Sequence, residues 1–173
     1  RRVAGAGRPA PATVFTIHNL GDAYQGRVPA DRFQELVALG LRPGDFSMEG
    51  LEFYGQVNVM KAGILHAEKV TTVSPTYQQE TLMPEGGKGL DGLLKTRGAD
   101  YVGILNGLDR ERWNPRTDAQ IPATFSADDL AGKAVDKASL QEELGVAREA
   151  RAPLLAVVSR LDHQKGMFLV VEQ

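Results

Sequence analysis

The chain alternates short runs of β-branched and apolar residues with segments of helical character. Four such runs stand out: Thr13–Ile17, Lys69–Val73, Tyr101–Leu105 and Leu154–Val158. Their length and composition are typical of β-strands, and the last run is apolar throughout, as expected of a strand buried on both faces. Strands that alternate with helices predict an α/β fold with a mostly parallel sheet.

Helices are predicted between these strands and after the last one. They are expected over Gln56–Ala67, from Ser74 onward, over Lys137–Leu144 and over Met167–Gln173. Ser74 is a good N-cap, because Pro75 occupies the first helical position after it. Asp136 can cap the third helix, and Gly145 suits the position just beyond its end.

Three segments rich in Gly, Pro, Asp or Asn are predicted to be loops. The first runs from Leu20 to Gly55 with a helical turn around Asp31–Ala38, and the second is Pro84–Gly92. The third, Asp109–Asp128, is interpreted as a linker in which Trp113 is a buried anchor.

The composition excludes several classes of function. The chain has no cysteine, so that disulfides, thiolate metal sites and a cysteine nucleophile are excluded together. Its three histidines have no metal-ligand spacing, and a net charge of −2 argues against a nucleic-acid partner. No apolar run approaches the roughly 20 residues of a membrane span, and no signal peptide is visible, so we expect a cytoplasmic protein.

Polar residues follow three of the predicted strands. These residues are His18-Asn19, Asn106-Gly107 and Arg160. Open α/β sheets bind ligands outside the carboxyl ends of their strands. If the strands run parallel, each group therefore lies at the ligand-binding edge of its own sheet.

The junction after the last strand carries two cations. Ser159–Gly166 leads into a helix start and contains Arg160 and Lys165. A helix N-terminus favours phosphate, Arg can bind its oxygens bidentately, and Lys adds a mobile charge. The pair could thus stabilise a departing diphosphate. Spacing alone, however, favours the interpretation that both are solvated loop cations.

The other candidates also have ordinary interpretations on the residues alone. A lone histidine such as His18 usually satisfies local hydrogen bonds, and Asn106-Gly107 is more often a turn than a ligand contact. The segment Gly86–Gly89 lacks the spacing and the trailing Ser/Thr of a P-loop, so we interpret it as a flexible connection.

Seven motifs occur in the order and at about the spacing of one family. They are TVFTIHN (Thr13–Asn19), LEFYGQ (Leu51–Gln56), KVTTVSPTY (Lys69–Tyr77), GLDGLL (Gly89–Leu94), GILNG (Gly103–Gly107), Trp113-Asn114-Pro115 and SRLDHQKG (Ser159–Gly166). Together they cover nearly the whole chain from Thr13 onward. The chain therefore resembles bacterial glycogen (starch) synthase, glycosyltransferase family 5.

The resemblance implies the GT-B architecture, in which two Rossmann-like domains enclose the active site. Residues 1–105 would be the later part of the N-terminal, acceptor-side domain, and residues 106–173 the linker and the start of the C-terminal, nucleotide-sugar-side domain. The implied reaction transfers glucose from ADP-glucose to the non-reducing end of an α-1,4-glucan with retention. The family requires no cofactor and no metal ion, and no nucleic-acid or membrane partner is expected.

The resemblance also implies a set of site residues. His18 would lie beside the transferred glucose, and Arg160 and Lys165 would hold the diphosphate, so these three are the expected catalytic residues. The implied substrate-binding residues are Asn19, Asn106, Gly107 and Gln164.

The chain departs from the family pattern and matches only part of it. Two residues are inserted between Asn19 and Tyr24, and Gly86 stands where an aromatic residue is usual. The family's upstream Lys-x-Gly-Gly loop would precede Arg1, and its later acidic residue and glycine-rich loop would follow Gln173. We therefore expect an internal fragment that has no synthase activity and folds poorly by itself.

Two other functions stay open. One is a different GT-B sugar transferase, similar to sucrose synthases, although the motifs at Leu51–Gln56 and Trp113 argue against it. The other is a degenerate, non-catalytic protein that binds glucan or nucleotide, for which the insertion and Gly86 leave room.

Overall fold

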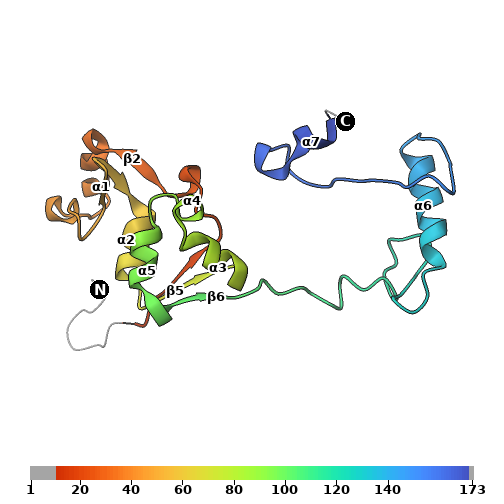
Figure 1. Cartoon of the computed structure of the whole chain (residues 1–173), viewed down its shortest axis with the longest axis horizontal. Coiled ribbons are helices and arrows are strands. Elements are labelled where there is room, and N and C mark those ends of the chain that lie inside the picture. Colours follow the sequence, from red (N-terminus) through yellow and green to blue (C-terminus); the bar gives the residue numbers. More distant parts are fainter. Residues whose placement is uncertain (1–10, 172–173) are drawn as a thin grey trace. The chain divides into compact units, whose positions relative to one another are not determined.

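The computed structural model describes residues 11–171 (Figure 1). The chain divides into two compact units, Arg1–Gly107 and Leu108–Gln173. The division falls two residues after the boundary predicted between residues 105 and 106. The assignment of the two parts to an acceptor-side and a nucleotide-sugar-side domain stays a prediction.

The first unit contains a parallel sheet of strand order β1-β5-β6 (Figure 1). Its strands are β1 (Val14–Ile17), β5 (Lys69–Thr72) and β6 (Tyr101–Gly103). Ile17 pairs with Thr72, and Thr72 pairs with Gly103, so all three strands end at the same level. The three predicted strands of this unit and their parallel arrangement are confirmed.

Five helices lie within the described residues 11–107 of the first unit. They are α1 (Phe33–Ala38), α2 (Val59–His66), α3 (Pro75–Thr81), α4 (Pro84–Gly87) and α5 (Asp91–Thr96), together with the 3-10 turns η1 (Asp22–Tyr24), η2 (Ala30–Arg32), η3 (Pro43–Asp45) and η4 (Gly98–Asp100). The predicted start of α3 is confirmed, because the Ser74 hydroxyl accepts the Tyr77 N–H at 2.9 Å with Pro75 in the first turn.

One apolar cluster joins the parallel sheet to its helices. Its buried members come from the three parallel strands, the loop after β1, the segment Glu52–Phe53, α2, and α5 with the residue before it. They are Ile17, Leu20, Phe53, Met60, Ile64, Val70, Leu90, Leu94 and Tyr101. Full burial of one large apolar side chain contributes about 1.5–3 kcal/mol to the stability of the fold. Because Leu20 belongs to this cluster, the core extends directly under the loop that follows β1.

A small antiparallel sheet of order β2-β4-β3 corrects the prediction for residues 20–58. Its strands are β2 (Arg27–Pro29), β3 (Glu52–Phe53) and β4 (Gln56–Asn58). The predicted loop therefore contains two short strands, and the helix predicted from Gln56 begins at Val59. Val57 is fully buried and pairs with both neighbouring strands. An apolar residue there fits helical and strand patterns alike, and long-range pairing decides between them.

The segment Pro84–Gly92, predicted to be a loop, is largely helical. It holds α4 and the first turn of α5. A Cβ on Gly87 would lie 2.3 Å from the Cβ of Asp91 and 2.7 Å from the carbonyl oxygen of Thr81. This glycine therefore permits close packing between neighbouring helices, whereas the sequence suggested flexibility.

The second unit has α6 (Gly132–Glu143), η5 (His163–Lys165) and α7 (Met167–Val171). The predicted third helix is confirmed, but it begins before Asp136, whose carboxylate instead accepts the Ala123 N–H at 2.9 Å. Gly145 lies just beyond the helix with φ of 65°, as predicted. The predicted last helix is present as α7, and residues 172–173 lie outside the described residues.

The strand predicted over Leu154–Val158 is wrong for this structure. The segment has no regular secondary structure, and Val158 is 99% exposed. A buried strand needs hydrogen-bonded neighbours, and the described residues 108–171 contain no strand that could pair with it. The prediction that Trp113 is a buried anchor is also wrong, because its side chain is 66% exposed.

Candidate functional site

The candidate site residues of the first unit lie at the carboxyl edge of the parallel sheet. His18 and Asn19 follow β1, and Asn106 and Gly107 follow β6, so the two loops leave the same edge on either side of β5. His18, Asn106 and Gly107 are exposed and Asn19 is half-buried. The sequence thus predicted the edge of the sheet at which they lie, and their contact with substrate stays a prediction.

The loop after β1 is fixed from its first residues. The side-chain oxygen of Asn19 accepts the Gly21 N–H at 2.8 Å and closes a short turn. Leu20 is fully buried, and its N–H donates to the hydroxyl of Tyr77 in α3 at 2.9 Å. His18 is therefore followed at once by backbone that is anchored to the core and to a neighbouring helix.

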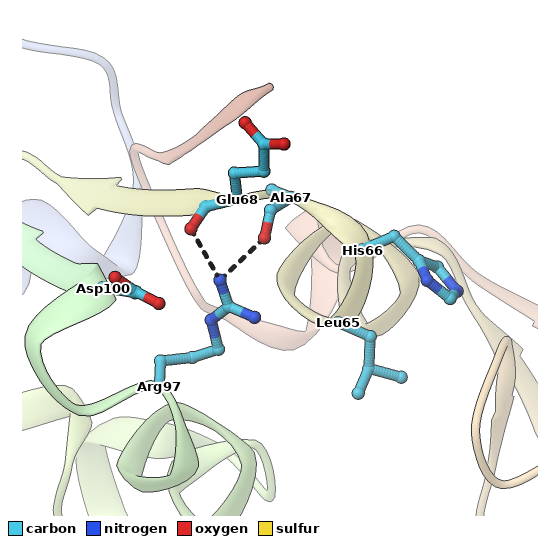
Figure 2. A pocket seen from close by; sticks show the side chains of 6 residues that line it. All are labelled: Leu65, His66, Ala67, Glu68, Arg97 and Asp100. Carbon is cyan, nitrogen blue, oxygen red and sulfur yellow. Dashed lines mark hydrogen bonds between the residues drawn. The ribbon is translucent and has the colours of Figure 1, made fainter. Parts of the chain in front are cut away.

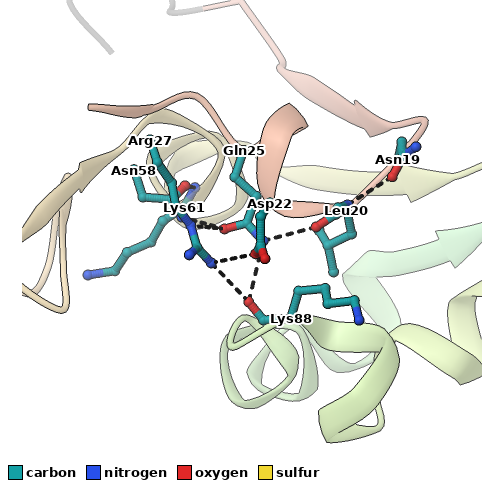
Figure 3. A network of polar contacts seen from close by, with 9 residues as sticks. Asn19, Leu20, Asp22, Gln25, Arg27, Asn58, Lys61 and Lys88 are labelled. Atoms are coloured by element: carbon teal, nitrogen blue, oxygen red, sulfur yellow. Dashed lines mark hydrogen bonds and ion pairs between the residues drawn. The ribbon is translucent and has the colours of Figure 1, made fainter. Parts of the chain in front are cut away.

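A buried amide, Gln25, connects this loop to three other segments (Figure 3). Its side-chain nitrogen donates to the carbonyl of Leu20 at 2.9 Å and to that of Lys88 at 3.3 Å. Its side-chain oxygen accepts from Asn58 at 2.7 Å and from Arg27 at 3.0 Å. The amide is fully buried and is satisfied on both sides, so it fixes the register of all four segments.

Arg27, the first residue of β2, extends this network to Asp22 and Phe53. Its guanidinium donates to the Lys88 carbonyl at 3.3 Å, pairs with Asp22 at 3.0 Å and lies 5.0 Å from the ring centre of Phe53. The Lys88 carbonyl thus receives donors from both Gln25 and Arg27 (Figure 3). The turn at Lys88-Gly89 is consequently held against the loop that follows His18.

Sequence reasoning missed Gln25 and Arg27 as structural partners of the site. The inserted residues before Tyr24 form η1, and the loop then returns so that Gln25 reaches the core. The available signal was a single amide in the Tyr24-Gln25-Gly26 motif. Its partners lie 33 and 63 residues away in the sequence, beyond any local pattern.

The predicted phosphate-binding residues belong to the second unit. Arg160, Gln164 and Lys165 are exposed. The backbone around them is shaped by Asp162, whose carboxylate accepts the Gln164 N–H at 3.0 Å and whose carbonyl accepts the Lys165 N–H at 2.9 Å. The turn η5 thus carries Gln164 and Lys165 next to the start of α7, and Arg160 precedes the turn. The contact of Arg160 and Lys165 with phosphate stays a prediction.

A polar cavity of about 560 Å³ lies at the opposite, amino-terminal edge of the parallel sheet (Figure 2). Arg97 crosses it and donates to the carbonyls of Ala67 and Glu68 at 2.7 and 3.1 Å. These carbonyls follow α2, so Arg97 acts as a cationic cap at the end of that helix. Because Glu68 and Asp100 also line the cavity, the site does not favour an anionic ligand.

Two kinds of feature were not found in the part of the chain that the structure describes. Over residues 11–171, no three His, Asp or Glu side chains gather in a way that could hold a metal ion. None of the helices there has the length and apolar character needed to cross a membrane.

Parallel strands joined by helices, with polar loops at the carboxyl edge, define an α/β protein of the kind that binds ligands at that edge. The chain belongs to the family described as "Starch synthase catalytic domain", which matches residues 5–96, and its architecture is GT-B.

Known proteins resemble the chain over nearly all of its length. It is 52% identical over 166 residues to a glycogen synthase of Leptothrix cholodnii, covering 96% of this chain and 33% of the relative. It is 52% identical to glycogen synthase 2 of Geobacter sulfurreducens, covering 93% of this chain and 32% of the relative. The catalytic domain of starch synthase IV from Arabidopsis thaliana, solved with ADP and acarbose bound, matches with a TM-score of 0.81 and 40% identity, covering 92% of this chain and 32% of that one. The chain thus spans about a third of the length of the relatives that it matches.

Proposed function

We propose that the complete protein is a glycogen or starch synthase that moves glucose from ADP-glucose to the non-reducing end of an α-1,4-glucan with retention. The family, the names of the similar proteins and the ADP and acarbose bound to the Arabidopsis relative support this proposal. No cofactor or metal ion takes part. Residues 1–105 belong to the acceptor-side domain, and residues 106–173 form the linker and the start of the nucleotide-sugar-side domain.

The arrangement of His18 and Asn106 is the observation that carries the proposal. Both follow parallel strands that end at one level on either side of β5. His18 lies beside the transferred glucose, and Asn19, Asn106 and Gly107 contact substrate from the same edge. A sugar ring held there is approached by two loops whose starting points are fixed by the same sheet.

Arg160 and Lys165 bind the diphosphate of the donor in this proposal, and Gln164 is a further substrate-binding residue. The bond between the glucose C1 and the diphosphate oxygen breaks through an oxocarbenium-like transition state, and a bond to the glucan 4-oxygen forms. The 4-hydroxyl proton leaves with the departing ADP. Two cations close to the diphosphate stabilise the negative charge that develops on it, which lowers the barrier.

The test uses the complete protein with ADP-glucose and a glucan primer. We expect Lys165→Ala to reduce kcat by about 100-fold or more, as is typical when a group that stabilises developing charge is removed. His18→Ala should also reduce kcat, because it removes the side chain beside the transferred glucose. Arg151→Ala, which removes an exposed cation of the same unit, is the matched control and should retain full activity. Undiminished turnover in Lys165→Ala would disprove the phosphate role.

Assays with other substrates separate the two competing functions. A sucrose synthase-like transferase would prefer UDP-glucose and accept fructose in place of glucan. A degenerate binding protein would bind glucan or nucleotide without any turnover. Transfer from ADP-glucose to glucan alone supports the proposed function over both.

A further inference from the structure

An exposed tyrosine occupies a strained position at the tip of a hairpin. Tyr54 and Gly55 form the two-residue turn between β3 and β4, with φ values of 49° and 76°. Turns that need two positive φ angles strongly prefer Asn-Gly or Gly-Gly, and a bulky residue there is disfavoured. Burial of the ring does not offset this cost, because Tyr54 is 84% exposed.

The ring of Tyr54 nevertheless has a packing partner. It packs edge-on against Phe53, with ring centres 4.7 Å apart and planes at 78°. A Cβ added to Gly89 would lie 3.0 Å from the Phe53 ring and 3.8 Å from that of Tyr54. The hairpin tip therefore lies along the turn at Lys88-Gly89, and glycine is needed at position 89 for this approach.

The two strained turns are neighbours, and one of them is tied to the candidate site. Among residues 11–171, the non-glycine residues with positive φ are Tyr54 and Lys88. The Lys88 carbonyl accepts from Gln25, whose side chain also holds Leu20 in the loop that follows His18. Strained residues persist where surrounding contacts enforce them, and they cluster at functional sites.

We propose that Tyr54 is a stacking platform for the glucan acceptor, with the side chain of Lys88 as a neighbouring hydrogen-bond donor. One face of a glucose ring carries C–H groups of slightly positive character, which contact the negative face of an aromatic ring favourably. Lys88 is exposed and supplies three N–H donors for sugar hydroxyls. A tyrosine side chain has only two side-chain torsions, so it loses little entropy when the sugar binds. This proposal rests on the proposed function and names an acceptor contact for it.

Tyr54→Asn in the complete protein provides the test. Asparagine tolerates the left-handed backbone, so the variant removes the ring and relieves strain together. We expect the KM for a maltooligosaccharide or glycogen acceptor to rise about tenfold, which corresponds to about 1.4 kcal/mol. The KM for ADP-glucose and the kcat at saturating acceptor should stay unchanged, and the thermal midpoint should stay the same or rise.

Two further variants serve as controls. Tyr54→Phe retains the ring and should keep the wild-type KM for acceptor. Met48→Asn removes another exposed apolar side chain and should also leave the KM unchanged. An unchanged acceptor KM in Tyr54→Asn would overturn the proposal. So would a lowered thermal midpoint with a parallel loss of kcat, because Tyr54 would then be a packing residue in the complete protein.

Direct binding of a maltooligosaccharide separates this inference from the proposed function. If the complete protein transfers no glucose, the proposed function fails. Weaker oligosaccharide binding by Tyr54→Asn than by the wild type, measured by calorimetry, would still support the platform. Equal binding by the two proteins would overturn it.

Discussion

At the scale of single residues, a buried amide helps to hold the loop that follows His18. Gln25 makes its four side-chain hydrogen bonds without solvent access. Such a group is costly to replace, because its partners are left buried and unpaired. The loop that carries the candidate site is thus stabilised by a residue that need not touch substrate.

Gln25→Leu should destabilise the complete protein. The substitution leaves the amide of Asn58 and the carbonyl of Leu20 without their partner, and we expect a loss of about 2–5 kcal/mol in the free energy of unfolding. Gln34→Leu replaces an exposed amide in α1 and should change stability by no more than about 0.5 kcal/mol. Urea denaturation measures both. Equal effects of the two substitutions would contradict the role of Gln25.

The sequence predicted part of this site and missed the rest for a physical reason. His18 and Asn106 could be placed because they follow strands, and strand ends are local features of the sequence. Gln25 and Tyr54 could not be placed, since their roles depend on contacts with the turn at Lys88-Gly89, which is distant in sequence. Local patterns predict where a chain emerges from a sheet and carry no information on which segments meet there.

At the scale of elements, the glycine that ends β6 is explained by packing. A Cβ on Gly103 would lie 2.2 Å from the carbonyl oxygen of Ser74 and 2.6 Å from the Cα of Pro75. The first turn of α3 therefore packs directly on the end of β6. In the motif Gly103–Gly107, this first glycine serves the helix–sheet contact, and Asn106 and Gly107 are left as the candidate substrate residues.

Gly103→Ala should accordingly lower the stability of the complete protein. The added methyl group meets backbone atoms that cannot rotate away, so α3 must shift, at a cost of about 1–3 kcal/mol. Gly92→Ala is the matched control, because it lies in α5 with nothing within 4 Å of the new Cβ. Alanine there should stabilise by about 0.5–1 kcal/mol through helix propensity. Denaturation midpoints that move the same way for both variants would argue against the packing role.

An exposed ion pair joins the starts of β5 and β6. The hydrogen bond from Lys69, at 2.5 Å, and its positive charge lower the pKa of Asp100 below its ordinary value of 3.8. A lowered pKa in the folded state means that the pair stabilises above the unfolded pKa and loses this effect as the pH falls through the folded pKa. Asp100→Asn should therefore lower the thermal midpoint at pH 7 and have no effect in strong acid.

Salt provides the control for this ion pair. Both side chains are about half exposed, at 58% and 49%, so the effect at pH 7 should be small. It should shrink further at about 1 M salt, where charges are screened within about 3 Å. A difference between wild type and Asp100→Asn that is equal at pH 7 and in strong acid would show that the charge plays no part.

At the scale of the whole molecule, the largest error of sequence reasoning concerns Leu154–Val158. The apolar run satisfies the pattern of a doubly buried strand, yet Leu155 and Val158 are 88% and 99% exposed. An apolar run of this kind needs neighbouring strands to pair with, and the described residues 108–171 contain none. In the first unit, by contrast, the three predicted strands pair with one another, and there the same kind of reasoning predicted the strands and their parallel arrangement.

The polypeptide of residues 1–173, prepared alone, should lack synthase activity and should not melt cooperatively as a whole. The chain corresponds to about a third of the relatives' length. We propose that further strands of the complete protein pair with Leu154–Val158 and bury its apolar side chains. Without them, these residues expose backbone hydrogen-bonding groups and apolar surface to water, and neither contributes to a cooperative transition.

Hydrogen exchange measures this directly. The amides of Leu154–Val158 should exchange freely in the isolated polypeptide and be protected in the complete protein. In the isolated polypeptide, the amides of β5 should exchange more slowly than these, because β5 pairs with a strand on each side within the first unit. A single cooperative melt of the isolated polypeptide, with protection at Leu154–Val158, would show that the segment finds its partners within these 173 residues.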